Sequence, residues 1–152
     1  MADVSVIEPG TVVVHETRHG MFQQEILVGQ HRLYADEPQN AGGLDSGPGP
    51  YDYLLAGLGA CTSMTVRLYA DFKKIPLENV SVRLHHDKIH VKDCETCDTK
   101  VNTVDHIERE ITLEGPLDAE QRKKLMEIAD KCPVHKTLES KIEIHTVERA
   151  PA

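Results

Sequence analysis

The sequence predicts an α+β fold in a single domain spanning residues 1–152, and three observations support that prediction. Strand-like segments come first, and two helical segments then alternate with further strands, which is an α+β order. A chain of 152 residues suits one domain better than two, and no internal repeat or shift in composition marks a boundary. Only 39% of the residues are hydrophobic and tryptophan is absent, which predicts an aliphatic core completed by a partner chain.

The first third of the chain has the composition of strands. Residues 11–14 form a β-branched run, and residues 25–28 and 31–35 flank Gly29-Gln30, a two-residue hairpin signal. The segment that follows, residues 36–50, is rich in glycine and proline and is predicted to be a loop. Such a loop is either a surface connection or a shaped approach to a site.

A helix is predicted from Tyr51 to Lys73, because this stretch lacks proline and its apolar residues recur at helical spacing. Pro50 suits the first turn of that helix, and Ile75-Pro76 ends it. We expect a central, buried helix whose inward stripe comprises Leu54, Leu58, Cys61, Thr65, Leu68 and Phe72. The glycines just before the cysteine each cost about 1 kcal/mol relative to alanine, so we expect another backbone to pack closely there.

The second half of the chain alternates strands with one more helix. Residues 80–84 and 107–113 alternate apolar and polar side chains, as half-buried strands do. Asp118 is predicted to cap a second helix together with Gln121, and the apolar stripe of that helix comprises Leu125, Ile128, Ala129 and Cys132. Pro133 is expected to stop the helix at the cysteine, and residues 142–146 are expected to form a last strand.

Composition and charge exclude several classes of function. A net charge of −8 and the lack of a basic stripe argue against a nucleic-acid partner. No apolar run approaches the roughly 20 residues that span a bilayer, and the N-terminal segment lacks the features of a targeting peptide. We therefore expect a soluble cytoplasmic protein, without a membrane partner, whose cysteines are reduced.

The two cysteines in helical segments have two interpretations. Cys61 and Cys132 are either buried hydrophobic residues or a peroxidatic and resolving pair. A nucleophilic Cys61 needs a nearby cation or hydrogen-bond donors, because a thiol buried among leucines is unreactive. Arg67 faces away from Cys61 on the same helix, whereas Arg18 and Arg32 are freer to reach it. The adjacent hydroxyls of Thr62 and Ser63 are interpreted as bonded to the helix backbone.

The chain resembles the OsmC/Ohr family, in an OsmC-like branch, at two fairly specific motifs. The first is Gly47-Pro48-Gly49-Pro50-Tyr51 leading into the Ala60-Cys61-Thr62 helix, and the second is Cys132-Pro133-Val134-His135. The order of strands, cysteine helix, strands and Cys-Pro helix also agrees, so the resemblance covers most of the chain.

The resemblance implies an intertwined homodimer that reduces organic hydroperoxides without a bound cofactor. Carried over, Cys61 is the peroxidatic thiolate and Cys132 resolves it as a disulfide, which a small dithiol of lipoyl or thioredoxin-like type then reduces. The family's thiolate-stabilising arginine is matched best by Arg18, with Arg32 in reserve. The family's glutamate after the proline is replaced here by Tyr51, and Asp52, one position later, is the candidate for its role.

A second cysteine pair, Cys94 and Cys97, has three interpretations. With His86 and His90 it offers four nitrogen and sulfur ligands for zinc, but two histidines on one extended strand would lie about 13 Å apart. As a redox dithiol it is disfavoured by the acidic residues around it, which raise thiol pKa values. The third interpretation is a loop without chemistry.

An alternative function for the whole chain comes from another class. It is a stress-related binding module of the same fold that holds a metal or a small molecule without peroxidase turnover. Cys61 would then be a packing residue.

Overall fold

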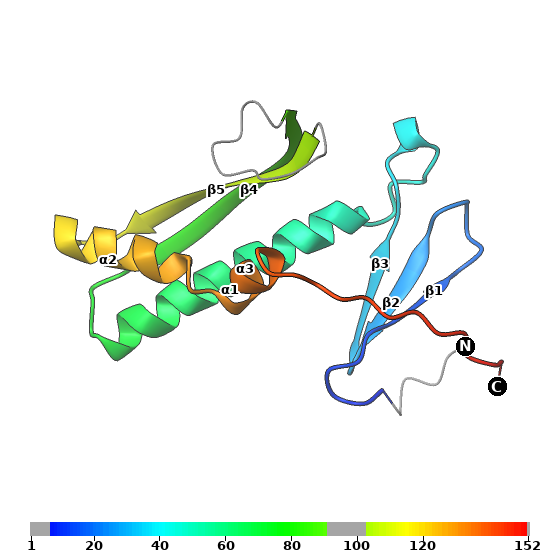
Figure 1. The fold of residues 1–152 in the computed structure, drawn as a ribbon, viewed down its shortest axis with the longest axis horizontal. Coiled ribbons are helices and arrows are strands. Elements are labelled where there is room, and N and C mark those ends of the chain that lie inside the picture. The colour runs from blue at the N-terminus through cyan, green and yellow to red at the C-terminus, as the bar shows by residue number, and fades with distance from the viewer. Residues whose placement is uncertain (1–6, 91–102, 152) are drawn as a thin grey trace. The chain divides into compact units, whose positions relative to one another are not determined.

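The computed structural model describes residues 7–90 and 103–151 (Figure 1). Helices and strands both occur, which confirms the predicted α+β class. The chain divides into two compact units, Met1–Leu54 and Leu55–Ala152, which we call unit 1 and unit 2 and describe separately. In the described ranges, no helix combines the length and apolar character that crossing a membrane requires.

Unit 1 contains an antiparallel sheet of three strands. Their order is β1 (Val13–Glu16), β2 (Gln24–Val28) and β3 (His31–Ala35), and the turn at Gly29-Gln30 joins the last two. Gly29 has a φ of +54°, a conformation that glycine adopts without steric cost. The hairpin signal in the sequence is therefore confirmed, and β1 begins two residues later than the predicted run.

The glycine- and proline-rich loop after β3 is organised by one buried carboxylate. Asp36 is 2% exposed, and it accepts hydrogen bonds from the backbone N–H groups of Glu37, Leu44 and Ser46. The Ser46 hydroxyl adds a fourth bond at 2.6 Å. The Ser46 hydroxyl and the three backbone donors outweigh the effect of burial and hold the pKa of Asp36 below its usual value. The loop is thus shaped by its own hydrogen bonds rather than left as a loose connection.

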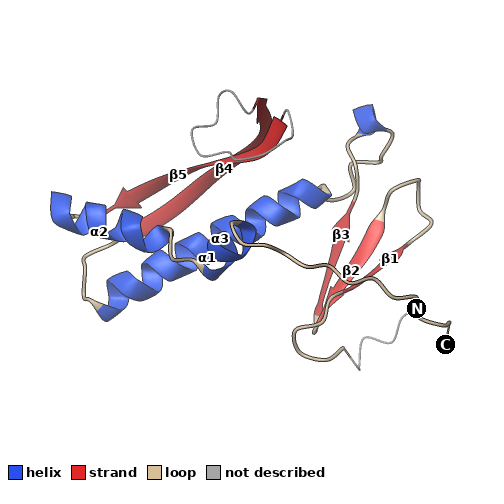
Figure 2. Ribbon diagram, in the orientation of Figure 1, coloured by secondary structure: helices blue, strands red, loops and turns tan. Residues whose placement is uncertain are grey.

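Unit 2 combines helices with a two-stranded hairpin (Figure 2). Helix α1 (Pro50–Phe72) begins at the predicted proline and runs into this unit. The antiparallel strands β4 (Asn79–His90) and β5 (Thr103–Glu114) follow, and then α2 (Ala119–Ala129) and α3 (Pro133–Leu138). The strands are longer than the predicted segments because the pairing continues through polar positions toward the end of the hairpin.

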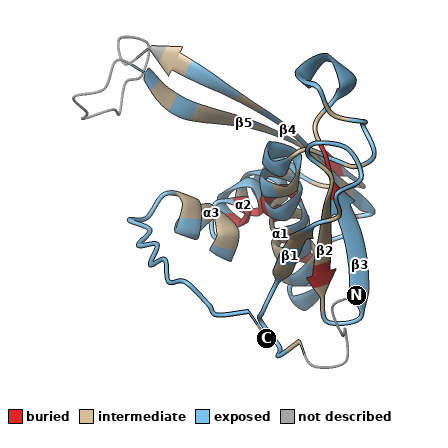
Figure 3. Ribbon diagram, turned by 90° about the vertical axis from the view of Figure 1, so that its right-hand side faces the viewer, coloured by how far each residue is buried: buried red, intermediate tan, exposed pale blue. Residues whose placement is uncertain are grey.

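The core of unit 2 lies where α1, the hairpin and α2 meet, as Figure 3 shows by burial. Its buried side chains are small or aliphatic, as the composition predicts. They are Val66, Ala70, Leu77, Leu113, Leu125 and Ala129.

The buried face of α1 differs from the predicted one. The residues that are buried along this helix are Leu58, Gly59, Thr62, Val66 and Ala70. Leu54, Leu68 and Phe72, which were expected to point inward, are exposed, so the prediction of a central helix buried by that stripe is wrong for the single chain. The small residues allow β4, β5 and α2 to approach closely, and this leaves the large apolar side chains on the opposite face.

One of the two glycines before Cys61 has the close neighbour that the sequence predicts. A Cβ at Gly59 would lie 2.7 Å from Cδ1 of Leu84 on β4, so alanine there would clash with that side chain. The neighbour is a leucine side chain rather than the expected backbone. Gly57 has open space at the same position, and its occurrence in the helix has no explanation in the packing.

The second helical region contains two helices rather than one. Asp118 and Gln121 form the predicted capping box, in which each side chain accepts from the backbone N–H of the other residue. Helix α2 ends at Ala129 and not at the cysteine, and Cys132 is the N-cap of α3 with Pro133 as the first helical residue. Proline not only ends a helix but is well suited to the first position of the next one.

The predicted last strand is also corrected. Residues 141–151 form neither helix nor strand, and both Ile142 and Ile144 are exposed. Alternating side chains predict a strand only where a neighbouring strand is available to accept its backbone hydrogen bonds. No strand in the described part of this chain pairs with that segment.

Candidate functional site

Unit 2 brings together the two cysteines that the sequence singles out. Cys61 lies in the middle of α1 and is partly exposed, whereas Cys132 lies between α2 and α3 and is fully buried. Both are free thiols, and the side chain of Cys61 interacts with that of Cys132. Two residues far apart in the sequence are therefore within reach of thiol–disulfide chemistry.

Cys132 is surrounded by hydrogen-bond donors. Its sulfur accepts from the backbone N–H of His135 at 3.4 Å, and it also interacts with the Thr62 hydroxyl and the Val134 backbone. Burial by itself raises the pKa of the Cys132 thiol, but the hydrogen bonds from Cys61, His135, Thr62 and Val134 outweigh it. The pKa of Cys132 is consequently lowered from its usual value.

One of these donors, Thr62, is itself bound by Arg109. Nη1 of Arg109, on β5, donates to the Thr62 hydroxyl at 3.0 Å and to the Ala129 carbonyl at 3.4 Å. Nη2 of the same guanidinium forms an ion pair with Asp130 at 2.7 Å. The Arg109 side chain is only 11% exposed. It therefore joins β5 to α1 and to the C-terminal end of α2, directly before Cys132.

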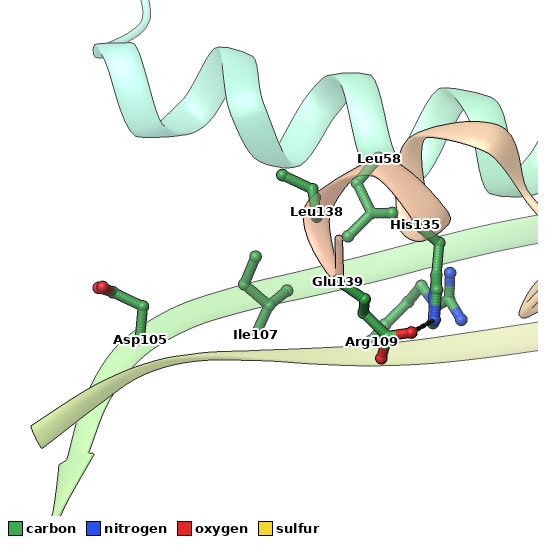
Figure 4. A pocket seen from close by; sticks show the side chains of 7 residues that line it. All are labelled: Leu58, Asp105, Ile107, Arg109, His135, Leu138 and Glu139. Atoms are coloured by element: carbon green, nitrogen blue, oxygen red, sulfur yellow. Dashed lines mark ion pairs between the residues drawn. The ribbon is translucent and has the colours of Figure 1, made fainter. Parts of the chain in front are cut away.

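Unit 2 contains a cavity of about 340 Å³, whose lining side chains are drawn in Figure 4. It adjoins the pair through Arg109 and His135, which contact Thr62 and Cys132 respectively. The His135 ring forms an ion pair with Glu139 at 3.0 Å, one turn further along α3. The lining combines three aliphatic side chains with four polar or charged ones: Leu58, Ile107, Leu138, Asp105, Arg109, His135 and Glu139.

The two arginines predicted to activate Cys61 both belong to unit 1. Arg18 has a φ of +63° and its side chain is 82% exposed, with an ion pair to Glu16 at 3.7 Å. Arg32 forms an ion pair with Glu25 at 3.1 Å. Since Cys61 belongs to unit 2, the assignment of either arginine to this thiol stays a prediction.

Asp52, the predicted partner of the arginine, has a different contact in unit 1. Its carboxylate accepts a hydrogen bond from the backbone N–H of Gly49 at 2.8 Å, just before α1 begins. A carboxylate in the first turn also interacts favourably with the helix dipole. In the described part of the chain no ion pair joins Asp52 to Arg18, so its role toward the arginine stays a prediction.

Arg67 and Thr62 behave as the sequence predicts. Arg67 does not serve the cysteines, because its guanidinium donates to the carbonyls of Leu77 and Glu78 at 2.7 and 3.1 Å. Thr62 donates its hydroxyl to the Leu58 carbonyl at 2.7 Å, as expected for a helix hydroxyl. Its additional contacts with Arg109 and Cys132 were not predicted.

Two of the four proposed zinc ligands fall outside the described residues. Cys94 and Cys97 lie there, and His86 forms an ion pair with Asp105 at 2.9 Å across the hairpin. Within residues 7–90 and 103–151, no three His, Cys, Asp or Glu side chains are grouped to hold a metal ion. The zinc hypothesis, which also includes His90, stays a prediction.

Arg109 is the site residue that sequence reasoning missed, although a signal for it exists. Ile107, Ile111 and Leu113 share one face of the strand that the sequence predicts, and Arg109 falls on that same face by alternation. A charged residue in an otherwise apolar row is informative, because a buried charge requires partners. Its partners Thr62 and Asp130 could not be identified without the tertiary structure.

The comparisons with known proteins give a family match and a set of similar solved structures. A family model described as OsmC-like protein matches residues 43–147, which is more than half of the chain. The match includes both cysteines of the site and both helical motifs. A search of curated protein sequences finds no match.

Solved structures resemble the fold over most of its length. An organic hydroperoxide resistance protein OsmC from Legionella pneumophila is 21% identical, with a TM-score of 0.62 over 88% of this chain and 91% of that chain. An OsmC-like protein from Mycoplasma pneumoniae is also 21% identical, with a TM-score of 0.64 and coverages of 85% and 84%. A putative organic hydroperoxide resistance protein from Vibrio cholerae, with captopril bound in one of its active sites, is 16% identical, with a TM-score of 0.58 and coverages of 88% and 87%.

Proposed function

This chain belongs to the OsmC-like protein family, and from that premise we propose that it is a thiol-dependent peroxidase acting on organic hydroperoxides. The observation that carries the proposal is the interacting pair of free thiols, Cys61 and Cys132. A pair held so close can form a disulfide after oxidation of one member. Two cysteines that served only as packing residues would not require a surrounding set of donors.

The difference in exposure supports an order for the two thiols. Cys61 is partly exposed and meets the peroxide, whereas Cys132 is fully buried and meets only Cys61. The Cys61 thiolate attacks one peroxide oxygen, the O–O bond breaks, and the leaving alkoxide takes up a proton to become an alcohol. Cys61 is then a sulfenic acid, oxidised by two electrons.

The second step converts the sulfenic acid on Cys61 into a disulfide with Cys132. The Cys132 thiolate attacks the Cys61 sulfur, the S–O bond breaks, and hydroxide leaves and takes up a proton to become water. A small dithiol of lipoyl or thioredoxin-like type then reduces the disulfide by exchange and is itself oxidised to a disulfide. No bound cofactor is required, and the reducing cytoplasm, where we place the protein, keeps such dithiols available.

The cavity beside the cysteine pair suits the organic part of the substrate. Leu58, Ile107 and Leu138 offer an apolar wall, and the guanidinium of Arg109 lies at the same cavity (Figure 4). An alkyl hydroperoxide presents an apolar body and one polar group, which corresponds to this lining.

A homodimer and an arginine near Cys61 complete the proposal. Met64, Leu68 and Phe72 form an apolar face of α1 that is 71%, 73% and 76% exposed in the single chain, and a second copy would bury it. Arg18 is the candidate cation for the Cys61 thiolate, and Asp52 is the candidate to orient it. This assignment rests on the family resemblance of the motifs around both residues.

Turnover kinetics test this function. Wild-type protein with an alkyl hydroperoxide and a reduced dithiol should consume the peroxide, and Cys61→Ser should consume none. The matched control is the double variant Cys94→Ser/Cys97→Ser, which removes two other thiols and should retain turnover. Equal rates in wild type and Cys61→Ser would contradict the proposal. Thermal stabilisation by a metal or small molecule without any turnover would favour a binding module instead.

A further inference from the structure

The buried side of the site contains a chain of contacts that the two-cysteine mechanism does not use. The Arg109 guanidinium donates to the Thr62 hydroxyl at 3.0 Å, and the same hydroxyl interacts with the Cys132 sulfur. Thr62 and Cys132 are both fully buried, and the Arg109 side chain is 11% exposed. A cation, a hydroxyl and a thiol thus lie one after another in a buried region. Electrostatic interactions are stronger there than in bulk water.

The single proton of the Thr62 hydroxyl has two possible acceptors. In the structure it is donated to the Leu58 carbonyl at 2.7 Å, while the hydroxyl oxygen accepts from Arg109. A hydroxyl rotates freely about its C–O bond, so the same proton can be donated to a Cys132 thiolate instead. The Leu58 carbonyl loses little by this change, because it lies within the helix and accepts a backbone bond there. The contact from Arg109 persists in both states.

We propose that Arg109 and Thr62 are a positioning pair for Cys132, in which Arg109 orients and polarises the Thr62 hydroxyl so that it stabilises the Cys132 thiolate. Arg109 acts through Thr62, whose hydroxyl oxygen accepts a hydrogen bond from Nη1 of the guanidinium. Its second nitrogen binds Asp130, which caps α2 two residues before Cys132. The guanidinium therefore fixes both the hydroxyl and the chain segment that carries the thiol.

Charged and titratable groups lie near Cys132 on each of the elements around it. Arg109 approaches from β5, Asp130 from the end of α2, and the Cys61 thiol from α1. On α3, the backbone N–H of His135 contacts the sulfur, while its ring is paired with Glu139. Asp130 offsets part of the Arg109 charge, so the hydroxyl and N–H donors, rather than a bare cation, stabilise the thiolate.

Arg109 and Thr62 would assist Cys132 in two roles, first as a nucleophile and later as a leaving group. This consequence rests on the proposed function. As a thiolate, Cys132 attacks the Cys61 sulfenic acid, and the S–O bond breaks as hydroxide leaves. When a dithiol later attacks Cys61, the S–S bond breaks and Cys132 leaves with the electron pair. A thiol of lower pKa leaves faster in such an exchange, so the same donors favour both steps.

The test is a titration of Cys132 alone, which does not depend on peroxidase activity. The parent is the full chain carrying Cys61→Ser, Cys94→Ser and Cys97→Ser, so that Cys132 is the single thiol and a hydroxyl remains at position 61. Ultraviolet absorbance of the thiolate is followed against pH. Adding Thr62→Val should shift the midpoint upward, and adding Thr62→Ser should leave it close to the parent. A threonine on the same helix, in Thr65→Val, is the matched control and should cause no shift.

Arg109 is tested in the same background. Arg109→Gln should also shift the midpoint upward, whereas Arg122→Gln should not. Arg122 is the matched control because its guanidinium likewise donates to a backbone carbonyl, that of Leu113 at 2.9 Å. Circular dichroism confirms that each variant is folded. If Arg109→Gln does not fold, the difference in midpoint between Thr62→Val and Thr62→Ser tests the proposal. A midpoint in Thr62→Val equal to that of the parent would overturn the proposal, as would equal shifts in Thr62→Val and Thr62→Ser.

A second measurement connects the pair to the reaction. With all four cysteines present, Thr62→Val should slow formation of the Cys61–Cys132 disulfide about tenfold, since one hydrogen bond to a charged group is lost. Thr62→Ser should restore the rate. If hydroperoxide leaves Cys61 unoxidised even in the wild type, the proposed function fails while the titration still decides the role of Arg109 and Thr62.

Discussion

The two cysteines differ in their burial and in where their polar partners lie. Cys132 is fully buried, and its donors come from α1 and α3 of the same unit, with Arg109 of β5 behind them. Cys61 is partly exposed, and its predicted cation and carboxylate, Arg18 and Asp52, belong to the other unit. In the proposed mechanism, the groups around the resolving thiol lie within unit 2, whereas the groups predicted to activate the peroxidatic thiol belong to unit 1.

The same contrast holds for the two faces of α1. The face with Thr62, Val66 and Ala70 is buried against the hairpin and α2. The opposite face presents the large apolar side chains of Leu68 and Phe72 to solvent. A low hydrophobic content with an exposed apolar face is typical of a chain that completes its core by association. In the proposed dimer, the side of α1 toward Cys132 is covered within one chain, and the other side is covered by the second copy.

The largest expected effect separates the roles of the two thiols. Cys132→Ser should abolish dithiol-dependent turnover, because the sulfenic acid on Cys61 then has no resolving partner. A sulfenic-acid probe should label Cys61 in this variant after one equivalent of hydroperoxide, and mass spectrometry locates the label. Unchanged turnover in Cys132→Ser would show that the reductant attacks Cys61 directly and that the buried thiol is not required.

The next largest effect tests the exposed face of α1. Leu68→Glu and Phe72→Glu should each weaken the proposed dimer more than tenfold, since burial of such a side chain contributes about 1.5–3 kcal/mol. Analytical ultracentrifugation measures the change. Met126→Glu, on an exposed apolar residue of α2, is the control and should leave the association unchanged. A wild-type chain that is monomeric at all concentrations would contradict the idea that this face is covered by a second copy.

A smaller effect concerns the pH dependence of stability. The pKa of Cys132 is lower in the folded chain than in the unfolded chain, so its ionisation favours the folded state. This contribution is complete above the unfolded-state pKa and is lost as the pH falls through the folded-state pKa. The difference in unfolding free energy between wild type and Cys132→Ser should therefore rise with pH across that interval. Urea denaturation at a series of pH values measures it, and a difference that is constant with pH would contradict the lowered pKa.

The smallest effect comes from a residue at the opposite end of α2 from the site. Asp118→Ala removes one side of the capping box and should lower the unfolding free energy by about 1 kcal/mol. The titration of Cys132 should not move, because Asp118 contacts none of its donors. Chemical denaturation together with the thiolate titration checks both outcomes. A shifted titration would show that the enclosed site responds to general loss of stability rather than to its specific donors.

The parts of the fold that the sequence predicts are those set by local chemistry. The hairpin at Gly29, the start of α1 at Pro50 and the capping box at Asp118 each depend on residues within a few positions of one another. Tertiary contacts add to these elements but do not redirect them. The interpretation of Cys61 and Cys132 as a pair also depended on local motifs, and the structure places the two thiols in contact.

The parts that the sequence did not predict depend on distant partners. Which face of α1 is buried is decided by β4, β5 and α2, and hydrophobicity alone selected Leu68 and Phe72 wrongly. The alternation at residues 142–146 predicted a strand, although no strand in the described ranges pairs with it. The role proposed for Arg109 depends on its contact with Thr62, which is 47 positions away in the sequence.

The central claim is that Cys61 and Cys132 act as one redox pair, and peptide mapping tests it most directly. Pure reduced protein is treated with one equivalent of an organic hydroperoxide, blocked with an alkylating reagent and digested without reduction. The account predicts the loss of two thiols and a cross-linked peptide that joins Cys61 to Cys132, with Cys61→Ser inert. Retention of both thiols, or equal thiol loss in wild type and Cys61→Ser, would contradict it.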